Sequence, residues 1–178
     1  MLVKNGEEMD IVKSMEEPKK IRLVQPDFSG EVLKDRSACR GILMREGKIL
    51  LVRFRVSGNY MIPGGGVEQG EKLQECLTRE FAEETGILVA PGDEFLILDE
   101  YFGSMHFVNH YFRCQEAGGE TRRKLTENEK KLGLSFEWVP FQEALTIFGS
   151  YETFRETKPE IAGLYHREFL ALRAFSEE

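Results

Sequence analysis

Three glutamates at helical spacing are the residues of this chain whose types and positions point most directly to chemistry. Glu80, Glu83 and Glu84 occupy positions i, i+3 and i+4, so on a helix their carboxylates share one face. Like charges so placed repel one another, and within this segment Arg79 supplies only one positive charge, with Glu75 four residues before it. Mg²⁺ or Mn²⁺ would neutralise the cluster, because these hard cations prefer carboxylate and water oxygens. The alternative is a solvated, Glu-rich helix face.

A glycine-rich loop precedes these glutamates. Gly64, Gly65 and Gly66 let the backbone approach a ligand or a metal, because no Cβ intervenes. A carbonyl of this loop could join the carboxylates as a ligand, and one or two metal ions could then hold a diphosphate and activate a water. A phosphate-binding P-loop is excluded, because residues 71–73 read Glu-Lys-Leu where Lys followed by Ser or Thr is required.

The glutamates must be positioned by a helix, which the sequence predicts over residues 71–85. Gly86 follows as a left-handed cap, and an irregular loop is expected for residues 60–71, which are rich in glycine. Apolar residues at three- and four-residue spacing mark the buried face of this helix: Leu73, Cys76, Leu77 and Phe81.

Strands and two further helices surround this segment. A break is expected at Ala117-Gly118-Gly119, and residues 120–131 are expected to form a charged, solvated loop. Helices are predicted for residues 141–148 and 159–175, the second with Pro159 in its first turn. Since strands and helices alternate along the chain, they are expected to share one core. The predicted strands are residues 21–25, 37–45, 48–55, 94–102, 106–115 and 135–140.

Composition limits the classes of function. The chain has 178 residues and a net charge of -7, so it lacks the basic balance typical of proteins that bind nucleic acid. The acidity fits a carboxylate site that needs a cation, although solubility alone explains it equally well. Residues 1–20 are predicted to be a polar arm without a role in the chemistry, and residues 21–178 a single domain. With no apolar run long enough for a signal peptide or a membrane span, we expect a cytoplasmic protein.

The cysteines carry no recognisable pattern. Cys39, Cys76 and Cys114 are odd in number, and none belongs to a CxxC pair. We therefore predict neither a disulfide nor a zinc site, and expect three small buried hydrophobic side chains.

A longer motif unites the loop and the helix. Gly65, five residues, Glu71, seven residues and then the run from Arg79 to Ile87 resemble the Nudix box, with every fixed position filled. Residues 60–68 look like the family's lead-in, and Glu137-Trp138-Val139-Pro140 looks like its late strand, so the resemblance spans roughly residues 38–150. It implies an α+β fold, a three-layer α-β-α sandwich around a mixed β-sheet, with the box as loop-helix-loop.

The resemblance also implies an activity. Nudix enzymes hydrolyse the pyrophosphate linkage of a nucleoside diphosphate joined to another moiety, by attack of a metal-activated water, with Mg²⁺ or Mn²⁺ as cofactor. The alternative is a Nudix-fold binding or regulatory module without turnover, but such modules show eroded boxes and this box is intact. The sequence leaves the identity of the nucleotide derivative open, and also whether the chain forms a homodimer.

Individual roles follow from the matching positions. The resemblance implies that Glu83, Glu84 and the Gly64 carbonyl are metal ligands, and that Glu80 is either a ligand or the general base. Arg79 would orient the glutamates through charge-assisted hydrogen bonds, and Glu71 would brace the loop.

Other site residues are less well specified. In many such enzymes a late-loop acid assists the base, and here Glu127 and Glu129 lie in that region, although a solvated charge run explains them too. Arg53 and Arg55 share one face of a strand and could reach substrate phosphates, while a solvated strand face is an equal explanation. Tyr101 could stack on a nucleobase or pack in the core. His106 and His110 are expected to be structural.

Overall fold

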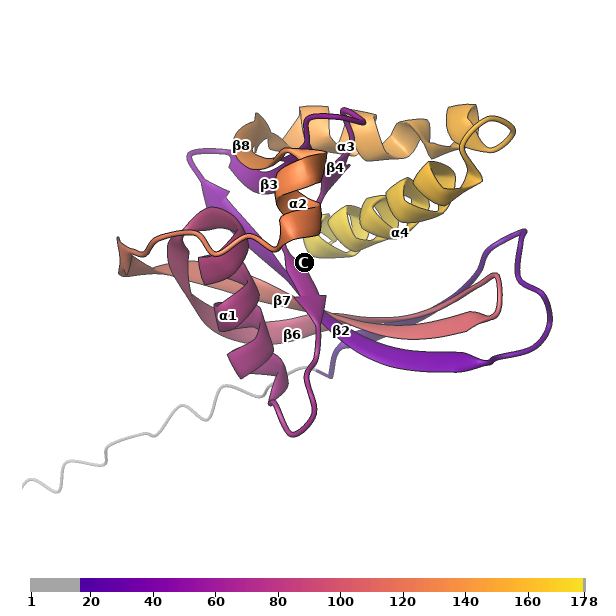
Figure 1. The fold of residues 1–178 in the computed structure, drawn as a ribbon, viewed down its shortest axis with the longest axis horizontal. Helices are drawn as coiled ribbons and strands as arrows, with labels where there is room; N and C mark the ends of the chain where they lie inside the picture. The colour runs from indigo at the N-terminus through magenta and orange to yellow at the C-terminus, as the bar shows by residue number, and fades with distance from the viewer. Residues whose placement is uncertain (1–16, 178) are drawn as a thin grey trace, which may run out of the picture.

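A mixed β-sheet lies at the centre of the computed structural model, which describes residues 17–177 (Figure 1). Most of the predicted arm therefore lies outside the described residues, and the first strand begins at Lys19, two residues earlier than expected. The strands are β1 Lys19–Val24, β2 Lys34–Arg45, β3 Lys48–Phe54, β4 Tyr60–Met61, β5 Gly64–Gly66, β6 Ile87–Phe102, β7 Met105–Glu120 and β8 Leu134–Pro140. The helices are α1 Leu73–Thr85, α2 Glu127–Leu132, α3 Phe141–Gly149 and α4 Pro159–Ser176, with a 3₁₀ turn, η1, at Ser150–Phe154.

Strand order shows that the sheet is mixed, as predicted. The main path runs β1-β6-β7-β2-β3-β4, while β5 pairs with β2 and β8 pairs with β3. The β1–β6 and β2–β7 pairs are parallel, and the other pairs are antiparallel. This pairing brings the glycine loop against the middle of β2, where Cys39 lies opposite Gly65.

Helices cover both faces of the sheet, with α1 on one side and α3 and α4 on the other (Figure 1). Because side chains alternate along a strand, consecutive residues of β2 enter different cores. Ile42 belongs to the core under α3 and α4, and Leu43 to the core under α1. Leu77 and Phe81 of α1 are fully buried in that second core. The predicted three-layer arrangement is therefore confirmed.

Several predicted boundaries were wrong, for local reasons. Helix α1 begins at Leu73, because the Glu75 carboxylate accepts the Lys72 N–H and so ends the preceding loop. The loop expected over residues 60–71 contains β4 and β5, since its backbone pairs with β3 and β2 despite the glycines. The glycines near residue 118 do not break β7, which stays paired with β6 as far as Glu120.

The charged stretch expected to be a solvated loop contains the short helix α2. The Thr126 hydroxyl accepts the Glu129 N–H, and the Glu129 carboxylate accepts the Thr126 N–H. A Thr-x-x-Glu capping box is a local signature of a helix start, so the sequence contains the signal for this helix. Gly133 closes the helix in the left-handed conformation, with φ of 66°.

The prediction of no disulfide was wrong. Cys39 of β2 and Cys76 of α1 are joined by a disulfide, with their Cα atoms 6.5 Å apart. The spacing of 37 residues has no recognisable motif, because the two cysteines meet only when α1 packs on the sheet. Cys114 is free and buried as expected, and burial raises the pKa of its thiol to about 12.

Reducing this disulfide is expected to lower the free energy of unfolding by about 2–4 kcal/mol, because the bond closes a long loop in the unfolded chain. Urea unfolding with and without dithiothreitol measures the difference. A Cys114→Ala variant should show the same loss, whereas Cys76→Ala should show no response to reductant. Three titratable thiols, rather than one, in the denatured and unreduced protein would show that the bond does not form.

Within residues 17–177, no helix is both long enough and apolar enough to cross a membrane.

Candidate active site

Arg79 organises the acidic face of α1. Its Nε and Nη2 donate to the two carboxylate oxygens of Glu71 at 2.7 and 3.0 Å, a two-pronged contact that holds the glycine loop against the helix. Its Nη1 donates to Glu80 at 2.8 Å and approaches Glu83 at 3.5 Å. The hydrogen bond from Arg79 lowers the pKa of Glu71. The structure thus brings together the four residues that the box predicts, and Arg79 compensates their charge more than the sequence indicated.

Glu84 is the buried member of the cluster, with only 4% of its surface exposed. Its carboxylate accepts the Gly64 N–H at 3.1 Å, which ties the loop to the end of the helix. Burial raises the pKa of this carboxyl to about 8, and the nearby charge of Glu80 adds to the effect. A carboxyl in this position is therefore either protonated or matched by a cation.

The Glu80 carboxylate lies directly over the loop, and this explains the glycine at position 65. A Cβ at Gly65 would stand 2.3 Å from the Glu80 carboxyl carbon. Burial raises the pKa of Glu80, while the hydrogen bond from Arg79 opposes that rise. Gly64 is needed for a different reason, since its φ is 141° and a Cβ there would meet the Cys39 carbonyl oxygen at 2.0 Å.

The donor set suits a hard cation, although its present arrangement does not enclose one. Among residues 17–177, no three His, Cys, Asp or Glu side chains converge closely enough to hold a metal ion. Glu80 and Glu83 turn to Arg79 instead. The carboxylates of Glu71, Glu80 and Glu83 share the single guanidinium of Arg79. Within the described residues, buried Glu84 has no cationic hydrogen-bond partner. These residues therefore fit Mg²⁺ or Mn²⁺ in chemistry, with rotation of Glu80 and Glu83 away from Arg79.

The segment after β7 closes the C-terminal end of α1, a contact that no local sequence pattern indicates. Arg123 donates from Nε to the Glu84 carbonyl at 2.5 Å and from Nη2 to the Leu134 carbonyl at 2.7 Å. The Lys124 N–H donates to the Glu83 carbonyl at 3.0 Å. A cation is favourable here because the last carbonyls of a helix lack intrahelical partners. Arg123 stands in a charged run without periodicity, so no pattern distinguished it.

The two candidate late acids differ in position. The charge of Glu129 raises the pKa of both Glu80 and Glu84, so Glu129 faces the α1 cluster. Glu127 is exposed and forms an ion pair with Lys130 at 2.6 Å. The location favours Glu129, and its role in the chemistry stays a prediction.

The predicted substrate-binding residues are not gathered at the α1 cluster. Arg53 donates to Glu137 at 2.8 Å and lies over the Tyr60 ring, while Arg55 is exposed beside Gly133. Tyr101 stacks on His106 at 4.4 Å between ring centroids, with the Arg22 guanidinium over its ring at 4.9 Å. None of these Tyr101 partners belongs to α1 or its loop.

The structural role expected for the two histidines agrees with their contacts. His106 also contacts Asp99 at 3.3 Å, and His110 contacts Glu94 at 2.5 Å. Both carboxylates lie on β6, so these pairs link the two long strands of the hairpin.

Two arginines near the cluster were missed by the sequence reasoning. Arg40 is buried within an apolar run of β2, where its Nη1 donates to the Ile62 carbonyl at 3.3 Å. The positive charge of Arg40 lowers the pKa of Glu84 and partly opposes the effect of burial. A charged residue inside a buried strand was the available signal. Arg36 is exposed at the start of β2, and its guanidinium reaches to 2.6 Å from the position of a Cβ on Gly66.

Comparison with known proteins identifies the family. The family model of the NUDIX domain matches residues 34–161. The chain belongs to the Nudix family. The resemblance of residues Gly65 to Ile87 to the Nudix box is thereby confirmed, and α1 is its Nudix helix.

Curated relatives of this Nudix chain align with it over limited lengths. An ADP-ribose pyrophosphatase of Methanocaldococcus jannaschii is 41% identical over 54 residues, which cover 29% of this chain and 32% of the relative. A MutT-like protein of Streptomyces ambofaciens is 34% identical over 88 residues, which cover 46% of this chain and 53% of the relative. The chain thus spans about a third to a half of the length of these relatives.

Solved structures support the Nudix fold. A NUDIX hydrolase of Nitrosomonas europaea superimposes with a TM-score of 0.55 at 21% identity, covering 75% of this chain and 90% of that one. An ADP-ribose pyrophosphatase of Streptococcus suis gives 0.54 at 19% identity, covering 80% of this chain and 92% of that one. At these identities the likeness establishes the fold alone.

Proposed function

We propose that this Nudix protein is a pyrophosphohydrolase that depends on Mg²⁺ or Mn²⁺ and cleaves the P–O–P linkage of a nucleoside diphosphate joined to another moiety. The observation that carries the proposal is the carboxylate cluster of α1, in which buried Glu84 lies beside Glu80 and has no cationic hydrogen-bond partner among the described residues. The intact box and the ADP-ribose pyrophosphatase among the relatives support it. By analogy with that relative, the second moiety is a sugar.

The residues around the cluster have distinct tasks in this proposal. When bound, a divalent cation would lower the pKa of a water and neutralise charge on the phosphates. Glu80 accepts the proton of the attacking water, because it lies over the glycine loop where a substrate can approach. Arg79 sets the orientation of Glu80, and Glu71 holds Arg79 in place. Arg36 reaches the Gly66 end of the loop, where a guanidinium suits a phosphate oxygen.

Purified protein with Mg²⁺ is expected to convert a nucleotide sugar or ADP-ribose into two phosphorylated products, and EDTA should abolish the reaction. The screen includes nucleoside triphosphates, dinucleoside polyphosphates and NADH, with products separated by anion-exchange chromatography. Glu83→Gln serves as the matched inactive control, because it keeps the size and removes one carboxylate. Binding of these nucleotides without turnover of any of them would favour the alternative of a regulatory module.

A further inference from the structure

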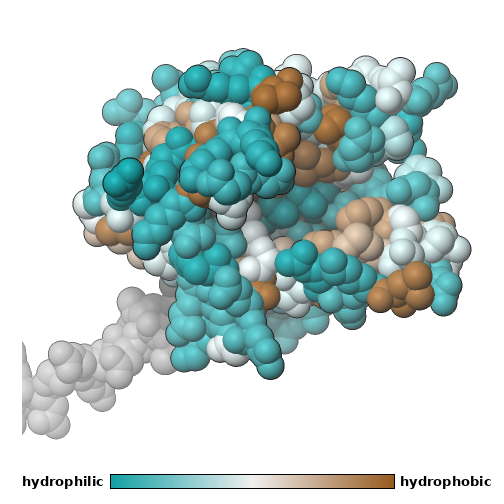
Figure 2. Space-filling view, viewed as in Figure 1, coloured by the Kyte–Doolittle hydropathy of each residue, from teal (hydrophilic) through white to brown (hydrophobic). Residues whose placement is uncertain are grey.

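The segment between β7 and α2 forms a small cationic pocket against the end of α1. Figure 1 shows this segment crossing α1, and Figure 2 shows mainly hydrophilic residues over this part of the molecule. The pocket has a volume of about 130 Å³ and shares two residues, Arg79 and Glu83, with the Nudix cluster. Its other lining residues are Ala82, Thr121, Arg122 and Lys124.

The backbone that carries the basic residues of this pocket is fixed to α1. The Thr121 N–H donates to the Gly86 carbonyl at 2.8 Å, and the Lys124 N–H donates to the Glu83 carbonyl at 3.0 Å. Between these two contacts, the Arg123 guanidinium donates to a backbone carbonyl at the end of the helix. The cations of the pocket are therefore held beside α1 before any ligand arrives.

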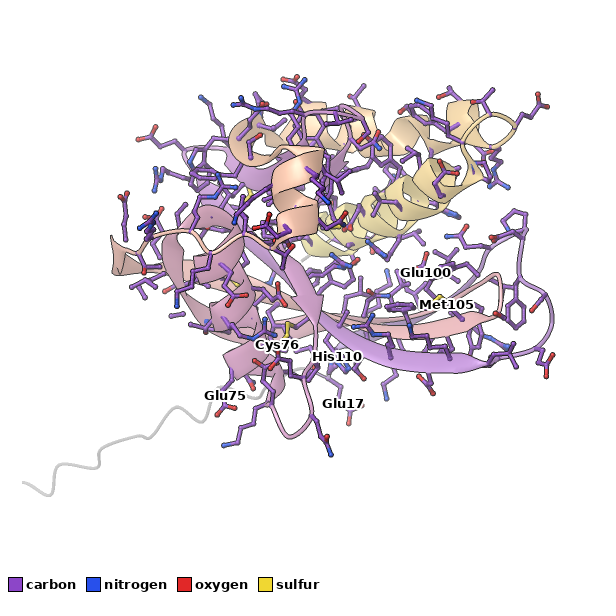
Figure 3. All side chains as sticks on the ribbon, viewed as in Figure 1. Glu17, Glu75, Cys76, Glu100, Met105 and His110 are labelled. Carbon is purple, nitrogen blue, oxygen red and sulfur yellow. A yellow bond between two sulfur atoms is a disulfide. The ribbon has the colours of Figure 1, made fainter. Side chains whose placement is uncertain are left out.

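Positive charge exceeds negative charge in this pocket. Arg122 and Lys124 are exposed, and neither side chain has a hydrogen bond or an ion pair with another described residue. The carboxylate of the lining is that of Glu83, which already approaches Arg79 at 3.5 Å. Figure 3 places Glu75 at the opposite end of α1, so that carboxylate does not neutralise the pocket. The pocket therefore attracts an anion, although the chain as a whole carries a net charge of -7.

A phosphate group suits this pocket in size and in chemistry. The volume is well below the roughly 300–1,000 Å³ of pockets for drug-sized ligands, so a complete nucleoside is too large. The guanidinium of Arg122, the ammonium of Lys124 and the hydroxyl of Thr121 all donate hydrogen bonds that a phosphate can accept. The proposed reaction already brings phosphates to the neighbouring cluster.

A second cationic position lies close enough to hold the other phosphate of a diphosphate. Arg36 reaches the glycine loop at Gly66, outside this pocket. Arg79 connects the two places, because it lines the pocket and its Nη2 donates to the Gly66 carbonyl at 3.3 Å. Glu80 and Glu84 do not line the pocket, so the water that Glu80 activates attacks the phosphate outside it.

The departing phosphate gains the charge that the pocket can stabilise. In the proposed reaction the water oxygen bonds to one phosphorus while the bond from that phosphorus to the bridging oxygen breaks. The bridging oxygen leaves with the second phosphate and carries the added negative charge, while a proton of the water passes to Glu80. Unpaired cations beside this oxygen stabilise the charge as it forms.

We propose that Arg122 and Lys124 bind the phosphate that leaves with the second moiety of the substrate. The proposal rests on the proposed function for the linkage that is cleaved. It makes the segment after β7, which lies outside the Nudix box, a part of the substrate-binding site.

The test removes both charges and keeps the contacts that hold the segment in place. Arg122→Gln/Lys124→Gln retains the backbone hydrogen bonds to α1 and the contact of Arg123. Lys19→Gln/Arg173→Gln is the matched control, because it also removes one lysine and one arginine from exposed positions, on β1 and α4.

Binding is measured by calorimetry with Mg²⁺ in a Glu80→Gln background, so that turnover does not interfere. The probes are ADP-ribose and ADP, which carry a second phosphate, and AMP, which lacks it; UDP-glucose, UDP and UMP form a matching series with another base. The pocket variant is expected to bind the diphosphates at least about tenfold more weakly, because charge-assisted hydrogen bonds are lost, and to bind the monophosphates like the parent. The control should bind every probe like the parent.

Three results would overturn the proposal. Equal weakening of the monophosphates would mean that the pocket holds the phosphate next to the nucleoside, and unchanged binding of every probe would mean that it holds no phosphate. Equal weakening in the control would reveal a general effect of net charge. The expected selective loss, in a chain whose parent hydrolyses none of the diphosphates, would overturn the proposed function alone. A parent that binds none of the probes would overturn both proposals.

The conservative variant Arg122→Lys/Lys124→Arg separates charge from local structure. With Glu80 intact, Arg122→Gln/Lys124→Gln is expected to lower kcat/KM by about tenfold or more, and the conservative variant to stay within about threefold of the parent. Circular dichroism confirms that each variant is folded. An equal loss in both variants would show that these residues act through the shape of the segment and not through charge, and the proposal would be wrong.

Discussion

Glu80→Gln is expected to lower kcat by about 10²–10⁴-fold, with a much smaller effect on KM, because it removes the proton acceptor and keeps the size of the side chain. The Arg79 hydrogen bond to Glu80 can persist with the glutamine oxygen, so the loop should stay in place. Steady-state kinetics with the best substrate of the screen measure the change. If metal ions raise the melting temperature of the variant as much as that of the parent, the variant has lost a general base and not a metal ligand.

Glu129→Gln is the decisive companion variant. Glutamine at this position can still complete the capping box of α2, so the substitution changes the charge near Glu80 without removing the cap. Glu127→Gln is the exposed control on the same helix. A tenfold larger loss of kcat in Glu129→Gln than in Glu80→Gln, with metal affinity equal in both, would assign the base to Glu129.

Glu84→Gln is expected to stabilise the metal-free protein at pH 8 while abolishing its response to Mn²⁺. The folded-state pKa of Glu84, about 8, lies above the ordinary value of 4.5. Between these values the folded protein holds a proton that the unfolded chain has lost, so the free energy of unfolding falls as pH rises. The glutamine avoids this loss, which is on the order of 4 kcal/mol at pH 8 and vanishes below pH 4.5.

Melting temperatures at pH 5 and pH 8, with EDTA or Mn²⁺, measure both effects. The parent should gain stability from Mn²⁺ because the ion binds the folded state, and Glu84→Gln should gain none. Glu83→Gln is the control. The Glu83 side chain is 38% exposed, so this variant should lose the stabilisation by Mn²⁺ without becoming more stable at pH 8. A full Mn²⁺ response in Glu83→Gln/Glu84→Gln would place the metal elsewhere.

Local patterns predicted the parts of this molecule that depend on nearby residues. The apolar spacing of Leu77 and Phe81 defined the buried face of α1, and Gly86 has the left-handed φ of 78° expected of its cap. The box residues Glu71 and Arg79 lie only eight residues apart in the chain, and in the structure they form an ion pair.

Features that depend on packing between distant segments could not be predicted from local patterns. Cys39 meets Cys76 only across the sheet–helix contact. Arg123 reaches the end of α1 from the far side of a hairpin. The pairing of Arg167 with Glu100 depends on how α4 crosses β6, a crossing that helical periodicity does not determine.

Different interactions hold the two ends of α1 in place. The two halves of the site, α1 and α2, therefore differ in rigidity. A covalent bond at Cys76 anchors the start of the helix, and Arg123 and the Lys124 amide hold its end. Helix α2 buries none of its residues and is held by its own caps and by backbone hydrogen bonds from Arg55 and Val56 to its last turn. Opening α1 requires disruption of a core, whereas α2 can open at small cost. The separation of Glu80 from Glu129 is thus adjustable, and whatever binds between them can set it.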